Sequence, residues 1–145
     1  IGQLRKKLRE TEAEKSSWLN SLMNAIINLK KTFEFQILVI DSLNALYAIS
    51  AMKNPRDEIY HFFEQLRELN MTTFLISEMK IGDLQFGKHE VEEFLCDGII
   101  HLELRPGKTG LSRYIGIIKM RDTAHDLDYF PLIISRAKGF EIVIK

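Results

Sequence analysis

The stretch Gln36-Ile-Leu-Val-Ile-Asp41 decides the fold class of this chain of 145 residues. Its four consecutive β-forming residues show no polar alternation, which is typical of a strand buried on both faces of a parallel sheet. The apolar run stops at Asp41, and Ser42 follows it. We therefore predict an α/β fold in which this strand ends on an acidic residue.

The residues that follow complete a strand–helix–strand unit. Asn54-Pro55 is a typical helix start, and Asp57 and Glu58 suit the first turn. An apolar stripe then continues along the helix at Ile59, Phe62, Phe63, Leu66 and Leu69. Residues 72–76 form a second apolar run. This order predicts a right-handed βαβ unit with parallel strands.

The residues before the first strand predict a helix. Residues 2–15 are strongly charged, so they are expected to be a charged N-terminal arm or a solvated helix. From Ser16 onward, apolar residues recur at helical spacing with further apolar residues beside them. The spaced positions are Trp18, Leu22, Ala25 and Leu29, and the neighbouring ones are Leu19, Met23 and Ile26.

The pattern changes beyond Lys80. A polar loop and a short helix over 90–96 are followed by four predicted strands. These strands span residues 99–104, 113–121, 130–135 and 140–144. Turn-rich segments join them, so we expect antiparallel hairpins. A parallel part thus runs into an antiparallel part, and we expect residues 1–145 to form one domain.

Composition argues against several classes of protein. Twenty Lys and Arg balance twenty Asp and Glu, so no overall charge attracts the chain to nucleic acid or to an anionic membrane. The apolar runs are too short to span a bilayer. Cys96 is the single cysteine and is expected to be buried rather than catalytic. Together with the absence of a leader sequence, this predicts a cytoplasmic protein, and Ile1 in place of Met predicts a piece of a longer one.

Polar residues follow both predicted parallel strands, as Asp41-Ser42 and Ser77-Glu78. Open α/β sheets bind ligands at the carboxyl ends of such strands. An acid that closes an apolar strand is the Walker B arrangement, whose carboxylate holds Mg²⁺ against nucleotide phosphates. The alternative is that Asp41 and Ser42 only cap a helix or form a turn.

Two cations are expected side by side at the end of the strand 113–121. Strand alternation places Lys119 and Arg121 on one face with Ile115 and Ile117. A neighbouring Lys and Arg suit a phosphate group. The alternative is a pair of solvated charges that protect a sheet edge from aggregation.

Three other motifs do not support a site. Gly107-Lys108-Thr109 looks like the end of a phosphate-binding loop, but Leu102 stands where that loop needs glycine, so a hairpin turn is expected. The four histidines lack the spacing of a zinc site. They are His61, His89, His101 and His125. The acids of 122–128 lack the glycine and terminal glutamate of a calcium loop.

In this order, the segments resemble the KaiC-like ATPases of the RecA superfamily. The strand that ends at Asp41-Ser42 resembles the family's Walker B strand, and residues 74–78 resemble its next strand. Residues 91–100 are similar to the helix and Asp-led strand that come next. The most specific match is 118–126, with a Lys-X-Arg segment followed by Thr and His. The resemblance covers about residues 30–145 and implies the C-terminal part of a RecA-like P-loop NTPase core.

This resemblance implies an ATPase that forms rings, such as hexamers, or filaments, with Mg-ATP held between adjacent subunits. Asp41 would take the metal role, and Lys119 and Arg121 would reach the neighbouring subunit's ATP as a catalytic pair. The residues implied to bind the nucleotide are Ser42, Ser77, Glu78 and His125.

The chain departs from the family pattern at its start. Residues 1–35 contain no counterpart of the Walker A loop or of the catalytic glutamate. We therefore expect this chain by itself to hydrolyse ATP weakly or not at all, to self-associate, and to expose apolar surface where strands are missing. The alternative is a non-catalytic oligomerisation module that uses the basic arm Arg5 to Arg9 on nucleic acid, although nearby glutamates dilute that charge.

Overall fold

The computed structural model describes residues 2–50, 52–82, 85–89, 91–107 and 110–144. The chain forms two compact units. The helical unit comprises residues 1–79 and 84–95, and the β unit comprises residues 80–83 and 96–145. The single domain expected over residues 1–145 stays a prediction.

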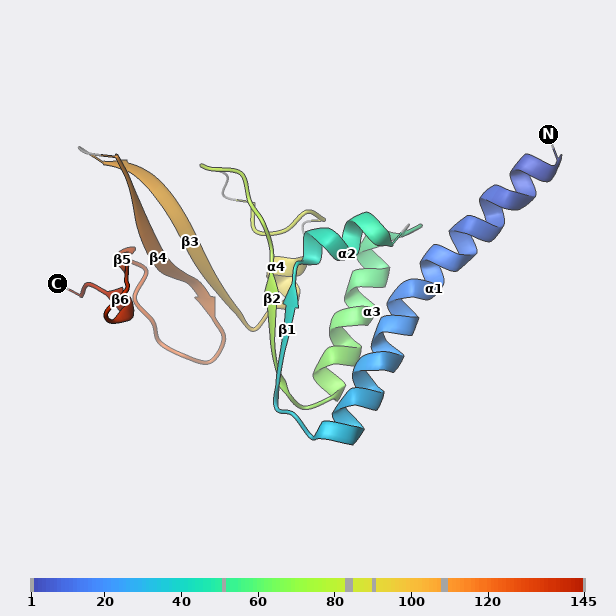
Figure 1. Ribbon diagram of the computed structural model, residues 1–145, viewed down its shortest axis with the longest axis horizontal. Coiled ribbons are helices and arrows are strands. Elements are labelled where there is room, and N and C mark those ends of the chain that lie inside the picture. The colour runs from blue at the N-terminus through green and yellow to red at the C-terminus, as the bar shows by residue number, and fades with distance from the viewer. Residues whose placement is uncertain (1, 51, 83–84, 90, 108–109, 145) are drawn as a thin grey trace. The chain divides into compact units, whose positions relative to one another are not determined.

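The helical unit contains the predicted βαβ arrangement. Its elements are α1 (Gly2–Phe33), β1 (Ile37–Asp41), α2 (Leu43–Ile49), α3 (Pro55–Glu68), β2 (Thr72–Ile76) and α4 (Glu92–Leu95). Strands β1 and β2 pair in parallel, with the helices α1 and α3 beside them (Figure 1). The parallel pairing confirms the prediction made from the two apolar runs and the helix between them.

The core of the helical unit lies between its helices. Its buried apolar residues are Leu19, Met23 and Ile26 of α1, Leu43 and Leu46 of α2, and Ile59, Phe62, Phe63 and Leu66 of α3. The stripe predicted for α3 is therefore confirmed in all but Leu69, which is half-buried. In α1, the three neighbouring residues Leu19, Met23 and Ile26 are the buried ones, whereas Leu29 of the spaced set is 50% exposed.

The prediction that β1 is buried on both faces is wrong. Ile37 and Val39 are 61% and 56% exposed, and Phe74 and Ile76 of β2 are exposed as well. Only alternate residues of each strand are shielded. In the described part of the chain, the sheet of this unit has two strands, so helices on one side leave the other apolar face open, as the missing strands led us to expect.

The β unit is an antiparallel sheet in the order β3-β4-β5-β6. Its strands are β3 (Gly98–Gly107), β4 (Gly110–Met120), β5 (Phe130–Ser135) and β6 (Gly139–Ile142). The predicted hairpins are confirmed, although β3 and β4 extend further into the predicted loop. Gly107 pairs with Gly110, so the Gly-Lys-Thr triplet begins in a hairpin strand and not in a phosphate-binding loop. Lys108 and Thr109 lie outside the described residues.

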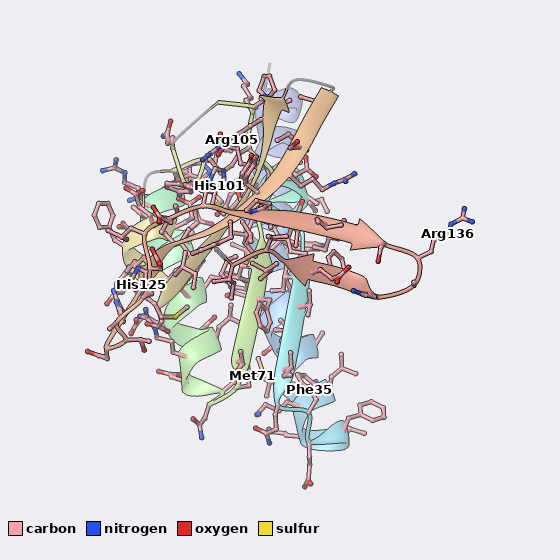
Figure 2. The ribbon with its side chains drawn as sticks, turned by 90° about the vertical axis from the view of Figure 1, so that its left-hand side faces the viewer. Phe35, Met71, His101, Arg105, His125 and Arg136 are labelled. Atoms are coloured by element: carbon pink, nitrogen blue, oxygen red, sulfur yellow. The ribbon has the colours of Figure 1, made fainter. Side chains whose placement is uncertain are left out.

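An arginine stacks on two tyrosine rings at the β3–β4 hairpin. The guanidinium carbon of Arg105 lies 4.8 Å from the ring centre of Tyr114 and 4.4 Å from that of Tyr129. The Tyr129 hydroxyl is 2.6 Å from Nδ1 of the buried His101. Figure 2 labels His101 and Arg105. Burial, and secondarily the charge of Glu103, raise the pKa of Tyr129, while Arg105 opposes this shift. These contacts give Tyr129 and His101 a structural role, because each packs against or hydrogen-bonds to other residues of the β unit.

Two smaller expectations are corrected. The helix expected over residues 90–96 spans only Glu92–Leu95 among the described residues, and Cys96 is half-buried rather than buried. Among the described residues, no helix combines the length and the apolar character that a bilayer crossing requires.

Candidate functional site

The carboxyl ends of β1 and β2 lie level with each other. Asp41, the last residue of β1, is the register partner of Ile76, the last residue of β2. Asp41 and the two residues after Ile76, Ser77 and Glu78, are all exposed. The two polar strand ends that the sequence predicted are therefore neighbours at one edge of the sheet, where ligands bind in open α/β folds.

Ser42 starts the helix that follows Asp41. It is 7% exposed and is the N-cap of α2, because its Oγ accepts a hydrogen bond from the Ala45 N–H at 3.3 Å. The capping role that the sequence left open as an alternative is thus present for Ser42. The cap starts α2 immediately after Asp41, so Asp41 lies where the chain leaves the strand.

Asn44 joins the two strand ends, and sequence reasoning missed it. Its Oδ1 accepts hydrogen bonds from the Glu78 N–H at 2.9 Å and from the Ser77 hydroxyl at 3.4 Å. Its Nδ2 donates to the Glu78 carbonyl oxygen at 3.4 Å. The one available signal was a polar amide in α2, whose other residues are Leu, Ala, Tyr and Ile.

A second polar anchor lies further along the same helix. The carboxylate of Glu92 is 4% exposed and accepts a hydrogen bond from the Tyr47 hydroxyl at 2.8 Å. It also accepts main-chain N–H bonds from Lys88, His89 and Val91 at 3.1 to 3.2 Å. One buried carboxylate therefore organises the segment that precedes α4 and ties it to α2.

Glu92→Ala is expected to destabilise the protein by about 2 kcal/mol, because it leaves buried donors without an acceptor. Glu68→Ala removes an exposed carboxylate at the end of α3 and is the matched control, expected to change stability by less than about 0.5 kcal/mol. Urea unfolding followed by circular dichroism measures both. Equal stability of the two variants would show that the hydrogen bonds to Glu92 contribute nothing net.

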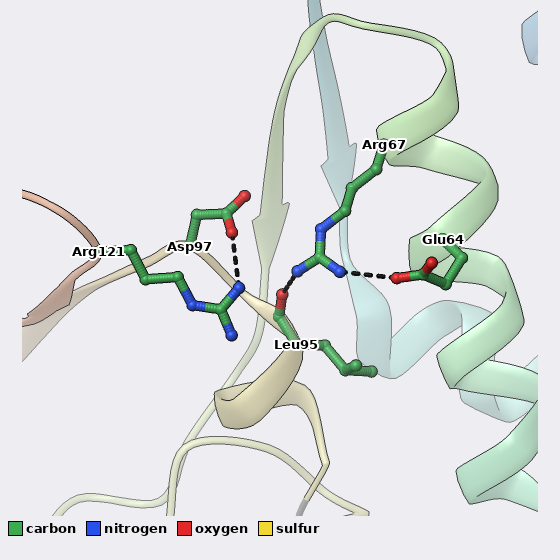
Figure 3. Close-up of polar contacts among 5 residues, drawn as sticks. All are labelled: Glu64, Arg67, Leu95, Asp97 and Arg121. Carbon is green, nitrogen blue, oxygen red and sulfur yellow. Dashed lines mark hydrogen bonds and ion pairs between the residues drawn. The ribbon is translucent and has the colours of Figure 1, made fainter.

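The β unit carries the predicted cation pair. Lys119 is half-buried in β4, whereas Arg121 lies just beyond the end of that strand and is exposed. Arg121 Nη1 lies 3.0 Å from Asp97 Oδ1, and the Arg121 N–H donates to the Asp97 carbonyl oxygen at 2.8 Å (Figure 3). An exposed ion pair of this kind contributes about 0 to 1 kcal/mol, so a phosphate could compete for the guanidinium at little cost.

His125 lies in the loop after β4. Its Nδ1 is 3.2 Å from the Thr123 carbonyl oxygen, and its Nε2 is a buried atom with no hydrogen-bond partner among the described residues. Asp41, Ser42, Ser77 and Glu78 thus belong to the helical unit, and Lys119, Arg121 and His125 to the β unit.

The donor atoms at Asp41 suit one kind of metal. In the described part of the chain, no three His, Cys, Asp or Glu side chains come together to form a metal site. Mg²⁺ commonly binds proteins through one or two carboxylates and takes its other ligands from water and substrate phosphates. The exposed carboxylate of Asp41, with Glu78 at the same sheet edge, fits that mode of binding and does not fit an all-protein cage.

Comparison with known proteins agrees with these observations. A protein-family model described as "ATPase: KaiC" matches residues 2–145. The circadian clock protein KaiC3 of Synechocystis sp. is 26% identical over 126 residues, which are 86% of this chain and 25% of that protein. A UPF0273 protein of Pyrobaculum aerophilum is 35% identical over 106 residues, which are 73% of this chain and 37% of that protein.

A solved structure extends the likeness to the fold. The crystal structure of a KaiC-like protein from Pyrococcus horikoshii OT3 matches with a TM-score of 0.74 and 27% sequence identity, covering 87% of this chain and 57% of that one. The matched part of the chain spans less than two fifths of the length of each of the two curated relatives named above. Because the family match extends over residues 2–145, the chain belongs to the KaiC-like ATPases of the RecA superfamily and has their α/β fold.

Proposed function

We propose that this chain supplies the Walker B strand and a trans-acting Lys–Arg pair to Mg-ATP binding and hydrolysis at the interfaces between subunits. The observation that carries the proposal is the level register of Asp41 and Ile76. It brings Asp41-Ser42 and Ser77-Glu78 to one edge of a parallel sheet, and the cation pair follows in the β unit.

Asp41 is the proposed holder of the metal ion. A bound Mg²⁺ would neutralise charge on the phosphate oxygens. Ser77 and Glu78 directly follow Ile76, the register partner of Asp41, so they come to the same sheet edge, which suits contact with the γ-phosphate side of the nucleotide. Ser42 supports the same site through the turn that it caps.

Lys119 and Arg121 are the proposed catalytic pair, acting on the ATP of a neighbouring subunit. A guanidinium placed against a phosphoryl group in transfer stabilises the charge that develops on its oxygens. The exposed ion pair with Asp97 would hold Arg121 in place until a phosphate replaces the carboxylate. We include His125 among the nucleotide-binding residues because it follows this pair and has a buried ring nitrogen without a partner among the described residues.

Self-association is part of the proposal. The 145 residues contain no Gly-X-X-X-X-Gly-Lys-Ser/Thr loop, so the main phosphate grip must come from residues outside them. Ile37, Val39, Phe74 and Ile76 leave an apolar sheet face exposed, which further protein would cover. Binding of nucleic acid and a cytoplasmic location stay predictions.

Titration calorimetry with ATP tests the function directly. The protein expressed from its own gene is expected to bind ATP in the presence of Mg²⁺, and about tenfold more weakly with EDTA, because the Asp41 carboxylate then faces the phosphates without an intervening cation. GMP, which lacks the β- and γ-phosphates, serves as the control ligand. An absence of ATP binding under both conditions would refute the proposal.

A further inference from the structure

Asn44 compensates for a break in the sheet. The parallel ladder between β1 and β2 ends at the pair Asp41 and Ile76, because the chain turns into α2 immediately afterwards. Past that point, no strand of the described residues in the helical unit pairs with the main chain of Glu78. The amide of Asn44 provides both an acceptor for the Glu78 N–H and a donor for the Glu78 carbonyl oxygen.

The amide is well matched to this task. A primary amide carries one acceptor and two donors, so it can replace both groups of a missing peptide neighbour. The 2.9 Å bond to the Glu78 N–H has the usual length of a strong hydrogen bond, and the two contacts at 3.4 Å are weaker. Asparagine is a poorer helix former than leucine or alanine, so its presence in α2 is explained by this bridge and not by helix stability.

We propose that Asn44 is a positioning residue, which holds Ser77 and Glu78 at a set place beside Asp41 so that the three side chains meet Mg-ATP as one rigid edge. The part of this inference that concerns Mg-ATP rests on the proposed function. The part that concerns the bridge from Asn44 to Glu78 rests on the hydrogen bonds alone. Asn44 lies in the first turn of α2, three positions after Asp41, so any movement of that helix start reaches Glu78 through a single side chain.

Tyr47 offers a matched comparison on the same helix. It lies one turn after Asn44 and ties α2 to Glu92 through its hydroxyl. Tyr47→Phe removes one hydrogen bond between α2 and a later segment, as a change at Asn44 does, but at a distance along the chain from Ser77 and Glu78. A general loosening of α2 would affect both variants alike, whereas a positioning role is specific to Asn44.

The informative variants are Asn44→Leu and Asn44→Asp. Leucine has a similar size and favours the helix, so it removes the bridge without weakening α2. Aspartate keeps an oxygen that can accept from the Glu78 N–H and loses the donor. In the protein expressed from its own gene, we expect Asn44→Leu to lower kcat for ATP hydrolysis about tenfold with KM changed less than twofold, because misplaced groups affect the reacting end of the substrate most.

Hydrogen exchange provides a readout that does not depend on activity. In the protein expressed from its own gene, the Glu78 amide is expected to exchange at least about tenfold faster in Asn44→Leu than in wild type and in Tyr47→Phe. Asn44→Asp is expected to retain most of the protection because its acceptor remains. The melting temperature of each variant, measured in parallel, is expected to stay within about 3 °C of wild type.

Two results would overturn the inference. One is a Glu78 amide that exchanges at the wild-type rate in Asn44→Leu. The other is a variant in which the Glu78 amide exchanges faster but kcat is unchanged. If wild type neither binds nor hydrolyses Mg-ATP, the proposed function fails, and the exchange measurement alone then decides on the bridge. Faster exchange in Asn44→Leu would still support Asn44 as the residue that positions Glu78, and unchanged exchange would reject it.

Discussion

In the protein expressed from its own gene, replacing Arg121 with alanine is expected to lower ATP turnover by about a thousandfold while the protein still binds nucleotide. An arginine supplied from a neighbouring subunit typically contributes at least this factor to phosphoryl transfer. Arg113→Ala is the matched control, because Arg113 is an exposed arginine on β4 at the other end of the strand. Phosphate release at saturating Mg-ATP measures both variants, and Arg113→Ala is expected to remain within about twofold of wild type.

Mixing variants tests whether Arg121 acts between subunits. A subunit with Arg121→Ala keeps Asp41, and a subunit with Asp41→Ala keeps Arg121. If each site takes Asp41 from one subunit and Arg121 from its neighbour, an equal mixture of the two variants is expected to restore about a quarter of the sites. Random placement in a ring with heterologous contacts gives this fraction, because each of the two positions holds the required variant in about half of the cases. A mixture as inactive as its components would instead assign Arg121 to its own subunit or to no catalytic role.

Asp41→Asn is expected to reduce ATP turnover by about a hundredfold and to raise the Mg²⁺ concentration at which turnover is half-maximal. The amide keeps the size of the carboxylate but removes the charge that holds a hard divalent cation. Initial rates over a range of Mg²⁺ concentrations at fixed ATP measure both effects. Glu68→Ala, which removes an exposed carboxylate on α3, is the control, and the assignment is wrong if the two variants share the wild-type Mg²⁺ profile.

The secondary structure that positions the site could be predicted because its signals are local. The apolar runs at β1 and β2 and the Asn-Pro start of α3 are properties of a few adjacent residues. They were sufficient to predict parallel pairing, because two neighbouring strands joined by a helix are usually parallel and connected by a right-handed crossover. The same reasoning could not choose between two adjacent apolar stripes of α1 that both satisfy helical spacing, and only packing selects Leu19, Met23 and Ile26.

The burial of β1 also exceeded what a local pattern can establish. An unbroken apolar run indicates a strand that is covered on both faces in a complete sheet. Whether both covers are present depends on other strands and helices, and this helical unit has two strands with one exposed apolar face. The pattern was therefore correct about strand type and wrong about exposure.

By itself, the sequence determined the βαβ order, the antiparallel hairpins and the acid at the end of the first strand, because each depends on residues close together along the chain. Only the tertiary structure decided the two polar anchors of α2. Asn44 reaches Glu78 and Tyr47 reaches Glu92 across 34 and 45 positions, respectively. A hydrogen bond depends on distance and direction in space, and neither is encoded in the spacing of two residues that the fold alone brings together.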